Sequence, residues 1–175
     1  MKQREDSERR IKRVILIRHA RAEEHAPQLS DSDRSLTLKG KQEAKSMAKI
    51  LKDKEKNPGT VLTSPAFRAL ETAIIFCKEY AIEPGNIRIC PEIYSMQDNE
   101  SYLAFLRSLD DEIDTVTMFG HNPMFSDVAR YFTNSKTEDI PKTGIICISF
   151  NQEKWALLEP GSGKVDYFLK PDSLR

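Results

Sequence analysis

Short apolar runs alternate along the chain with longer segments in which apolar residues recur at helical spacing. The first run, residues 14–17, is continuously apolar and mostly β-branched, which is typical of a strand buried on both faces of a sheet. Similar runs at residues 60–63, 87–90 and 115–119 predict three further strands. Because helical segments separate these strands, the pattern predicts a mainly parallel sheet with helices on both faces.

The helical segments carry recognisable start signals. Thr37 is expected to cap a helix that runs to about Lys54. Its apolar stripe consists of Gly40, Ala44, Met47, Ala48 and Leu51. Ser64 as N-cap with Pro65 at the first helical position predicts a second helix, and residues 98–109 predict a third. A last helix is expected to follow Asn122 as cap and Pro123 as first residue.

The two ends of the pattern differ from its middle. Residues 144–150 and 155–158 predict a hairpin whose polar turn is 151–154. Residues 21–35 are polar, contain a proline and predict a loop. The fold class expected from the whole pattern is α/β, a three-layer α/β/α sandwich with a mostly parallel central sheet and an antiparallel edge near the C-terminus.

Composition narrows the class of protein. The chain has 175 residues, enough for one domain, which we expect to span 13–175 after a charged leader at 1–12. Its formal net charge is zero, so no global field favours nucleic acid or an anionic membrane as partner. No apolar stretch suits a signal peptide or a membrane span, and we expect a cytoplasmic monomer. Its three cysteines are far apart, which favours small buried side chains over a zinc site or disulfides; they are Cys77, Cys90 and Cys147.

Candidate chemistry gathers where the predicted strands end. Arg18 and His19 follow the first strand, Ser64 and Arg68 follow the second, and His121 follows the fourth. Ligands of open α/β sheets bind outside the carboxyl ends of the strands, so these side chains are expected to converge. Arginine forks match phosphate oxygens, and a phosphoryl group is therefore the expected ligand.

His19 can do more than bind such a group. A neutral imidazole is a good nucleophile near neutral pH, and neighbouring arginines oppose its protonation. A backbone carbonyl is the simplest anchor for its other ring nitrogen. Arg18, Arg68 and His121 would hold the equatorial oxygens during transfer, so the chemistry is expected to need no metal and no cofactor.

Four motifs then carry a family resemblance. They are Arg18-His19-Ala20-x-Ala22, Leu36-Thr37-x-x-Gly40-x-x-x-Ala44, Ser64-Pro65-x-x-Arg68-Ala69-x-x-Thr72 and Gly120-His121-Asn122-Pro123. In this order they resemble the histidine phosphatase superfamily, which includes phosphoglycerate mutases, and the short chain looks most like its SixA-type phosphohistidine phosphatases. The resemblance implies that His19 is the nucleophile, that Arg18 and Arg68 clamp the phosphoryl group, and that His121 is the second histidine of the phosphate pocket.

The proton donor is left open by the resemblance. The acid phosphatase branch has aspartate where this chain has Asn122. The mutase branch uses a glutamate just after the third strand, and Glu92 occupies that point. Glu23 and Glu24 are alternatives from the opposite loop, and solvent is another.

The substrate is argued from the size of the chain and the leaving group. The segment between Thr72 and Gly120 is short, whereas larger superfamily members insert a cover there. An open pocket favours a phosphoryl group carried by a protein, and phosphohistidine breaks without a strong acid. Two alternatives stay open: an enzyme for a small phosphorylated metabolite or nucleotide, mutase-like enzymes included, and a non-catalytic phosphate-binding module.

Overall fold

The computed structural model describes residues 11–24, 28 and 30–171 of the chain. The predicted leader falls largely outside these residues, and the first strand already begins at Lys12. No helix in the described ranges is long and apolar enough to span a membrane. Cys77 and Cys147 are buried as free thiols and Cys90 is half-buried, in agreement with their apolar surroundings in the sequence.

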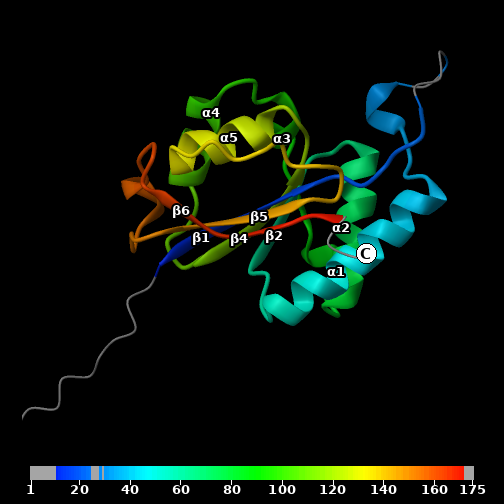
Figure 1. Cartoon of the computed structure of the whole chain (residues 1–175), viewed down its shortest axis with the longest axis horizontal. Helices are drawn as coiled ribbons and strands as arrows, with labels where there is room; N and C mark the ends of the chain where they lie inside the picture. The colour runs from blue at the N-terminus through cyan, green and yellow to red at the C-terminus, as the bar shows by residue number, and fades with distance from the viewer. Residues whose placement is uncertain (1–10, 25–27, 29, 172–175) are drawn as a thin grey trace, which may run out of the picture.

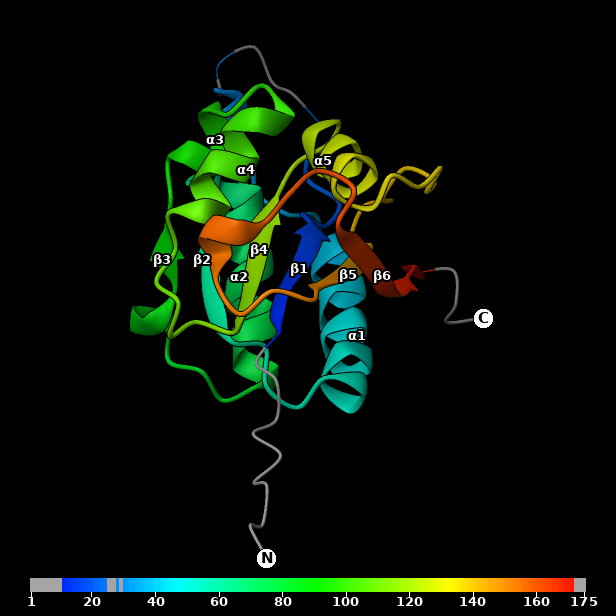
Figure 2. The same cartoon turned by 90° about the vertical axis from the view of Figure 1, so that its left-hand side faces the viewer.

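A six-stranded sheet in the order β3-β2-β4-β1-β5-β6 forms the middle layer (Figures 1 and 2). Four strands are parallel: β1 (Lys12–Arg18), β2 (Thr60–Thr63), β3 (Arg88–Ile89) and β4 (Thr115–Gly120). β5 (Ile145–Phe150) pairs antiparallel with β1, and β6 (Gly163–Leu169) pairs antiparallel with β5. The predicted mixture of a parallel sheet with an antiparallel C-terminal edge is confirmed.

Helices cover both faces of this sheet, so the predicted three layers are present (Figure 1). On one face lie α1 (Leu38–Lys54) and α2 (Phe67–Glu79), which pack on Ile15 and Ile17 of β1. On the other face lie α4 (Asn99–Arg107) and α5 (Met124–Thr133), which pack with Val14 and Leu16. The alternation along β1 is the pattern of a strand buried on both faces. Short helical turns complete the chain: α3 (Glu92–Ser95), η1 (Asp31–Asp33), η2 (Pro84–Asn86) and η3 (Trp155–Leu157).

The C-terminal hairpin was predicted with the wrong second strand. Residues 155–157 form the η3 turn, because Trp155 is fully buried and its Nε1 donates to the Ile113 carbonyl at 2.7 Å. The true partner of β5 is β6, an edge strand in which Lys164 and Asp166 are exposed. Edge strands tolerate such polar residues, which weakens their apolar signal in the sequence. The predicted third strand, 87–90, shortens to the two exposed residues of β3.

Two predicted helix starts are also wrong, whereas the cap of α1 is confirmed. The Thr37 side chain accepts a hydrogen bond from the Gly40 amide at 2.9 Å. In α2 the N-cap is Ala66, because the Ser64 hydroxyl turns toward His121 and accepts the Ala66 amide only within the preceding turn. In α5 the N-cap is Pro123, because the Asn122 amide group donates to a loop carbonyl. The side chains of Ser64 and Asn122 thus hydrogen-bond to groups near the strand ends and do not cap the helices.

Candidate active site

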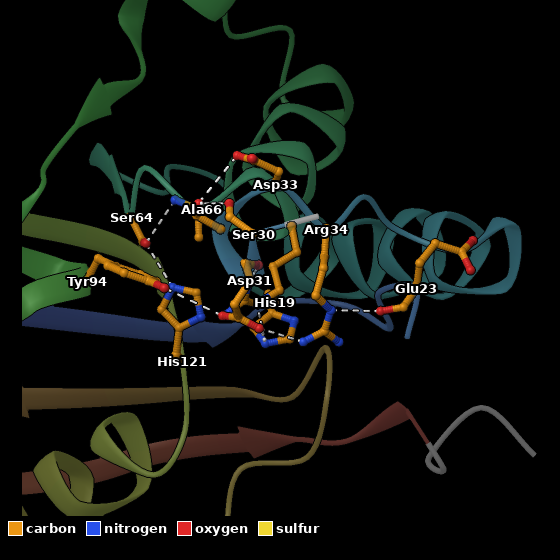
Figure 3. A network of polar contacts seen from close by, with 12 residues as sticks. His19, Glu23, Ser30, Asp31, Asp33, Arg34, Ser64, Ala66, Tyr94 and His121 are labelled. Atoms are coloured by element: carbon orange, nitrogen blue, oxygen red, sulfur yellow. Dashed lines mark hydrogen bonds and ion pairs between the residues drawn. The ribbon is translucent and has the colours of Figure 1, made fainter. Parts of the chain in front are cut away.

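Four predicted side chains meet at the carboxyl ends of β1, β2 and β4. Arg18 ends β1, His19 follows it, Arg68 lies in the first turn of α2 and His121 follows β4. Arg68 Nε lies 3.3 Å from His19 Nε2, and the two histidine ring centroids are 5.3 Å apart. The predicted convergence is confirmed, and we call these four residues the strand-end cluster. Figure 3 shows its two histidines with Ser64, Asp31 and Tyr94 around them.

The orientation of His19 is fixed through both ring nitrogens. Its Nδ1 lies 2.8 Å from the carbonyl oxygen of Ala20, so Nδ1 carries the proton and donates it. Nε2 then keeps its lone pair, which accepts the Arg68 Nε–H. The Ala20 amide is in turn held by the Thr72 hydroxyl at 3.0 Å, which stabilises the turn after β1. The lone pair of Nε2 is thus presented beside a cation.

Both histidines are neutral at pH 7. Burial lowers the pKa of His19 to about 3, the Ala20 carbonyl opposes this shift, and His121, Arg68 and Arg18 add to it. Burial also lowers the pKa of His121 to about 4, again with Arg68 and Arg18 contributing. The arginines thus lower the pKa of His19, as predicted from the sequence, but desolvation contributes more than they do.

The Ser64 hydroxyl holds one ring nitrogen of His121. Its Nε2 lies 2.8 Å from the Ser64 hydroxyl, which already accepts the Ala66 amide at 3.2 Å. When the hydroxyl donates its proton to Nε2, Nδ1 carries the ring proton. Nδ1 is buried without a hydrogen-bond partner among the described residues. A buried donor of this kind indicates a site for an acceptor ligand.

Arg18 is hydrogen-bonded through a terminal guanidinium nitrogen, whereas its Nε has no partner among the described residues. Its Nη1 donates to the Ile140 carbonyl at 2.9 Å, which also accepts from the Asn122 side chain at 3.0 Å. Its Nε is buried and has no partner within the described ranges. The loop after α5, which contains Ile140, thereby positions one arginine of the cluster. Two unpaired donors, Arg18 Nε and His121 Nδ1, suit the oxygens of an anion.

Sequence reasoning missed Asp31. Its backbone oxygen accepts Arg68 Nη1 at 2.6 Å, and its Oδ2 accepts Arg68 Nη2 at 2.8 Å. Its Oδ1 accepts Arg34 Nη1 at 2.8 Å. Asp31 therefore holds both terminal nitrogens of Arg68, so that Nε–H is the donor that faces His19. The available signal was Arg68 itself, since a buried guanidinium needs a carboxylate partner, but spacing alone does not say which acid of the 21–35 loop supplies it.

The three predicted proton donors lie away from the cluster. Glu92 is exposed at the start of α3 and lines a surface hollow with Ser101 and Phe105 of α4. Glu23 and Glu24 are exposed, and Figure 3 shows the Glu23 carboxylate directed away from His19. No hydrogen bond or ion pair in the described part of the chain joins any of these carboxylates to the cluster.

α3 brings Tyr94 to the cluster instead of Glu92. Its ring lies edge-on to His121, with centroids 5.4 Å apart, and its hydroxyl is 3.5 Å from Asp31 Oδ2. Tyr94 is 40% exposed, whereas His19 is 8% exposed. The aromatic ring therefore stands at the outer margin of the cluster.

The chain is similar to proteins of known family and structure. The family model of the histidine phosphatase superfamily (branch 1) matches residues 14–93. Phosphoglycerate mutase 1 of Saccharomyces cerevisiae is 28% identical over 154 residues, which cover 85% of this chain and 57% of the mutase. The chain thus spans little more than half of that enzyme.

Two solved structures are similar over nearly their whole length. The protein histidine phosphatase SixA complexed with tungstate is 25% identical, with a TM-score of 0.78 over 93% of this chain and 99% of that one. A SixA structure from Agrobacterium tumefaciens is 25% identical, with a TM-score of 0.77 over 91% of this chain and 98% of that one. Motif order, cluster geometry and these likenesses agree, and together they support the histidine phosphatase superfamily, with SixA-type phosphohistidine phosphatases among the similar structures.

Proposed function

We propose that this protein is a phosphatase that removes a phosphoryl group from a histidine of a partner protein through a covalent intermediate on His19. The observation that carries the proposal is the buried His19 Nε2, unprotonated and 3.3 Å from Arg68 Nε. A nucleophile with its lone pair directed at a phosphate-binding cation has no use in a protein that only binds phosphate.

The first step forms a bond between His19 Nε2 and phosphorus while the bond from phosphorus to the leaving group breaks. Arg18 Nε, Arg68 and His121 Nδ1 would bind the equatorial oxygens as their charge shifts. The His19 ring becomes cationic on phosphorylation, and the Ala20 carbonyl at 2.8 Å stabilises that charge through Nδ1–H. In the second step water attacks phosphorus, and the His19 ring leaves in its neutral form.

The choice of a protein substrate rests on the surroundings of the cluster. Between α2 and β4 the chain forms only β3, α3, α4 and the η2 turn. The half-exposed Tyr94 and Asp31 stand at the margin, so a phosphoryl group presented on a larger molecule can reach His19. The likeness to SixA supports phosphohistidine, since one of those structures is of a protein histidine phosphatase with tungstate, a tetrahedral oxyanion.

A second candidate is an enzyme for a small phosphorylated metabolite, which the 28% identity to a phosphoglycerate mutase favours. The test is to incubate the pure protein, in the presence of a metal chelator, with a phosphohistidine-bearing protein, an aryl phosphate and 3-phosphoglycerate. We expect hydrolysis of the phosphohistidine protein and no activity in a His19→Gln variant. Turnover of small esters alone would favour the second candidate, and no turnover of any substrate would leave a non-catalytic phosphate-binding module.

A further inference from the structure

One carboxylate stands beside the strand-end cluster, and the mechanism above does not use it as a reacting group. In the described part of the chain, Asp31 is the acid whose side chain hydrogen-bonds to the cluster, through Arg68 Nη2 at 2.8 Å. It reaches the cluster from the loop before α1, and Arg34 holds its other oxygen at 2.8 Å. Its side chain is 47% exposed, compared with 8% for Arg68.

The exposure of these groups gives the direction in which a leaving group departs. Phosphoryl transfer is in line, so the leaving atom lies on the side of phosphorus opposite His19 Nε2. His19 and Arg68 are buried, and the half-exposed side chains that contact the cluster are Asp31 and Tyr94. A leaving group attached to a partner protein must extend toward solvent, and it therefore passes these two side chains.

The charge of Asp31 restricts what it can do for that leaving group. The hydrogen bond from Arg34 and the charge of Arg68 lower the pKa of Asp31, so the carboxylate is ionised at neutral pH. An ionised carboxylate cannot protonate the alkoxide of a serine or threonine phosphate. It can accept a hydrogen bond from an N–H, and a phosphorylated imidazole carries one when its second nitrogen is protonated.

We propose that Asp31 is a specificity-determining residue that accepts the N–H of the departing imidazole, with Tyr94 beside it as an aromatic wall. The inference rests on the proposed function and names the leaving group that the site selects. As the bond from phosphorus to the substrate ring nitrogen breaks, that nitrogen keeps the electron pair. The ring enters as the protonated phosphoimidazolium and leaves as neutral imidazole. Its remaining N–H is bonded to Asp31, so no further proton is required.

Because the leaving imidazole needs no added proton, this step is compatible with an exposed Glu92. A neutral imidazole leaves without a general acid, whereas a mutase or ester phosphatase must protonate an oxygen. The exposed Glu92 carboxylate is therefore not needed for the proposed substrate.

The test compares two leaving groups in the same protein. Kinetics are measured with phosphoimidazole and with p-nitrophenyl phosphate, whose aryloxide carries no N–H, for the wild type, Asp31→Asn and Tyr94→Phe. We expect Asp31→Asn to lower kcat/KM for phosphoimidazole by about tenfold to hundredfold more than for the aryl phosphate, because a charge-assisted hydrogen bond is lost for one substrate only. Tyr94→Phe keeps the ring and should change that ratio little.

A role limited to holding Arg68 would predict a different result, since a displaced guanidinium slows both substrates equally. An equal fall for the two substrates in Asp31→Asn therefore overturns the inference and leaves the phosphatase intact. If the wild type hydrolyses the aryl phosphate but not phosphoimidazole, the proposed function itself has failed.

Two further variants complete the design. Asp33→Asn removes a neighbouring carboxylate of the same η1 turn and serves as the matched control, with an unchanged ratio expected. Asp31→Glu covers the case in which Asp31→Asn does not fold: it keeps the charge at a shifted position, and we expect a smaller change in the same direction. An unchanged ratio of the two kcat/KM values in a folded Asp31→Glu would contradict the inference, whether or not Asp31→Asn folds.

Discussion

The two ends of β1 bury polar groups in opposite ways. At the first end the Lys12 ammonium is fully buried and donates to the carbonyls of Asp111 at 2.5 Å and Ile113 at 3.0 Å and to Asp114 Oδ1 at 3.1 Å. The Trp155 ring lies beneath it, with its centroid at 5.8 Å. Every proton of the ammonium has a partner, as a structural role requires.

At the second end the partners are missing. Arg18 Nε, His121 Nδ1 and Thr143 Oγ1 are buried and have no hydrogen-bond partner within the described residues. Thr143 also adopts a φ of 63°, a left-handed conformation that is strained for a β-branched residue. Its amide donates to the carbonyls of Arg18 and His19. The polar group at the Lys12 end is thus satisfied, whereas the Arg18 end combines unsatisfied groups with backbone strain; we call the latter the reactive end, after the proposed function.

The largest effect is expected at the reactive end. We expect His19→Gln to lower kcat by about 10⁴-fold or more, because removal of a nucleophile abolishes the covalent route. The free energy of unfolding at pH 7 should not fall comparably. Steady-state kinetics and urea unfolding of the same samples check both statements. Retention of a substantial fraction of wild-type turnover would remove His19 from the mechanism.

Substitution of Arg68 should also lower activity much more than stability, but by a smaller factor than substitution of His19. Arg68→Gln removes the cation beside Nε2, and loss of one such donor costs about 3 kcal/mol of transition-state stabilisation, a few hundredfold in kcat/KM. Lys41→Gln, an exposed cation on α1, is the control. A similar loss of activity in both variants would show a general effect of positive charge instead.

Substitution of Lys12 should have the opposite result, a loss of stability with activity retained. Lys12→Met leaves the Asp111 carbonyl without its Lys12 donor, leaves the Ile113 carbonyl with the Trp155 donor alone and removes the ion pair to Asp114. We therefore expect a loss of about 3 kcal/mol in the free energy of unfolding. The activity per folded molecule should stay unchanged. Lys49→Met, exposed on α1, serves as the control for the loss of charge. A fall in kcat without a fall in stability would break the distinction between the two ends.

The smallest expected effect is a dependence of stability on pH. The pKa of His19 is about 3 in the folded protein and 6.5 ordinarily, so the unfolded chain binds the proton more readily. Stability linked to His19 is therefore complete above pH 6.5 and is lost as the pH falls toward 3. Between pH 7 and pH 5 the wild type should lose about 2 kcal/mol more than His19→Gln. Urea unfolding at the two pH values measures this difference, and equal losses would contradict a buried neutral His19.

Patterns local in sequence predicted most of the fold. The apolar runs at β1, β2 and β4 and the cap at Thr37 depend on neighbours along the chain, and the structure confirms them. The role of Ser64 could not be read in this way, because its hydroxyl bonds to a histidine 57 positions away. β6 was missed and residues 155–158 were predicted as a strand for a similar reason, since an edge strand and a packed turn are defined by what lies against them in space.

The sequence predicted the site residues that follow strand ends or start a helix. It did not predict the residues that irregular segments bring to the cluster. Arg18, His19, Arg68 and His121 follow strand ends or start a helix, so topology alone places them together. Asp31 and Tyr94 reach the cluster from irregular segments whose path the apolar pattern does not specify. Glu92 shows the converse, because it occupies the expected position in the sequence while its side chain is exposed on α3.

The most direct test of the account is to trap the phosphorylated enzyme. The protein is mixed with radiolabelled phosphoimidazole, quenched within one turnover, digested and analysed by mass spectrometry. The account predicts a phosphate that is stable in alkali and labile in acid on the peptide that contains His19, formed as fast as turnover and absent in His19→Gln. Turnover with no such adduct, or with the phosphate on His121 or Ser64, would contradict His19 as the nucleophile.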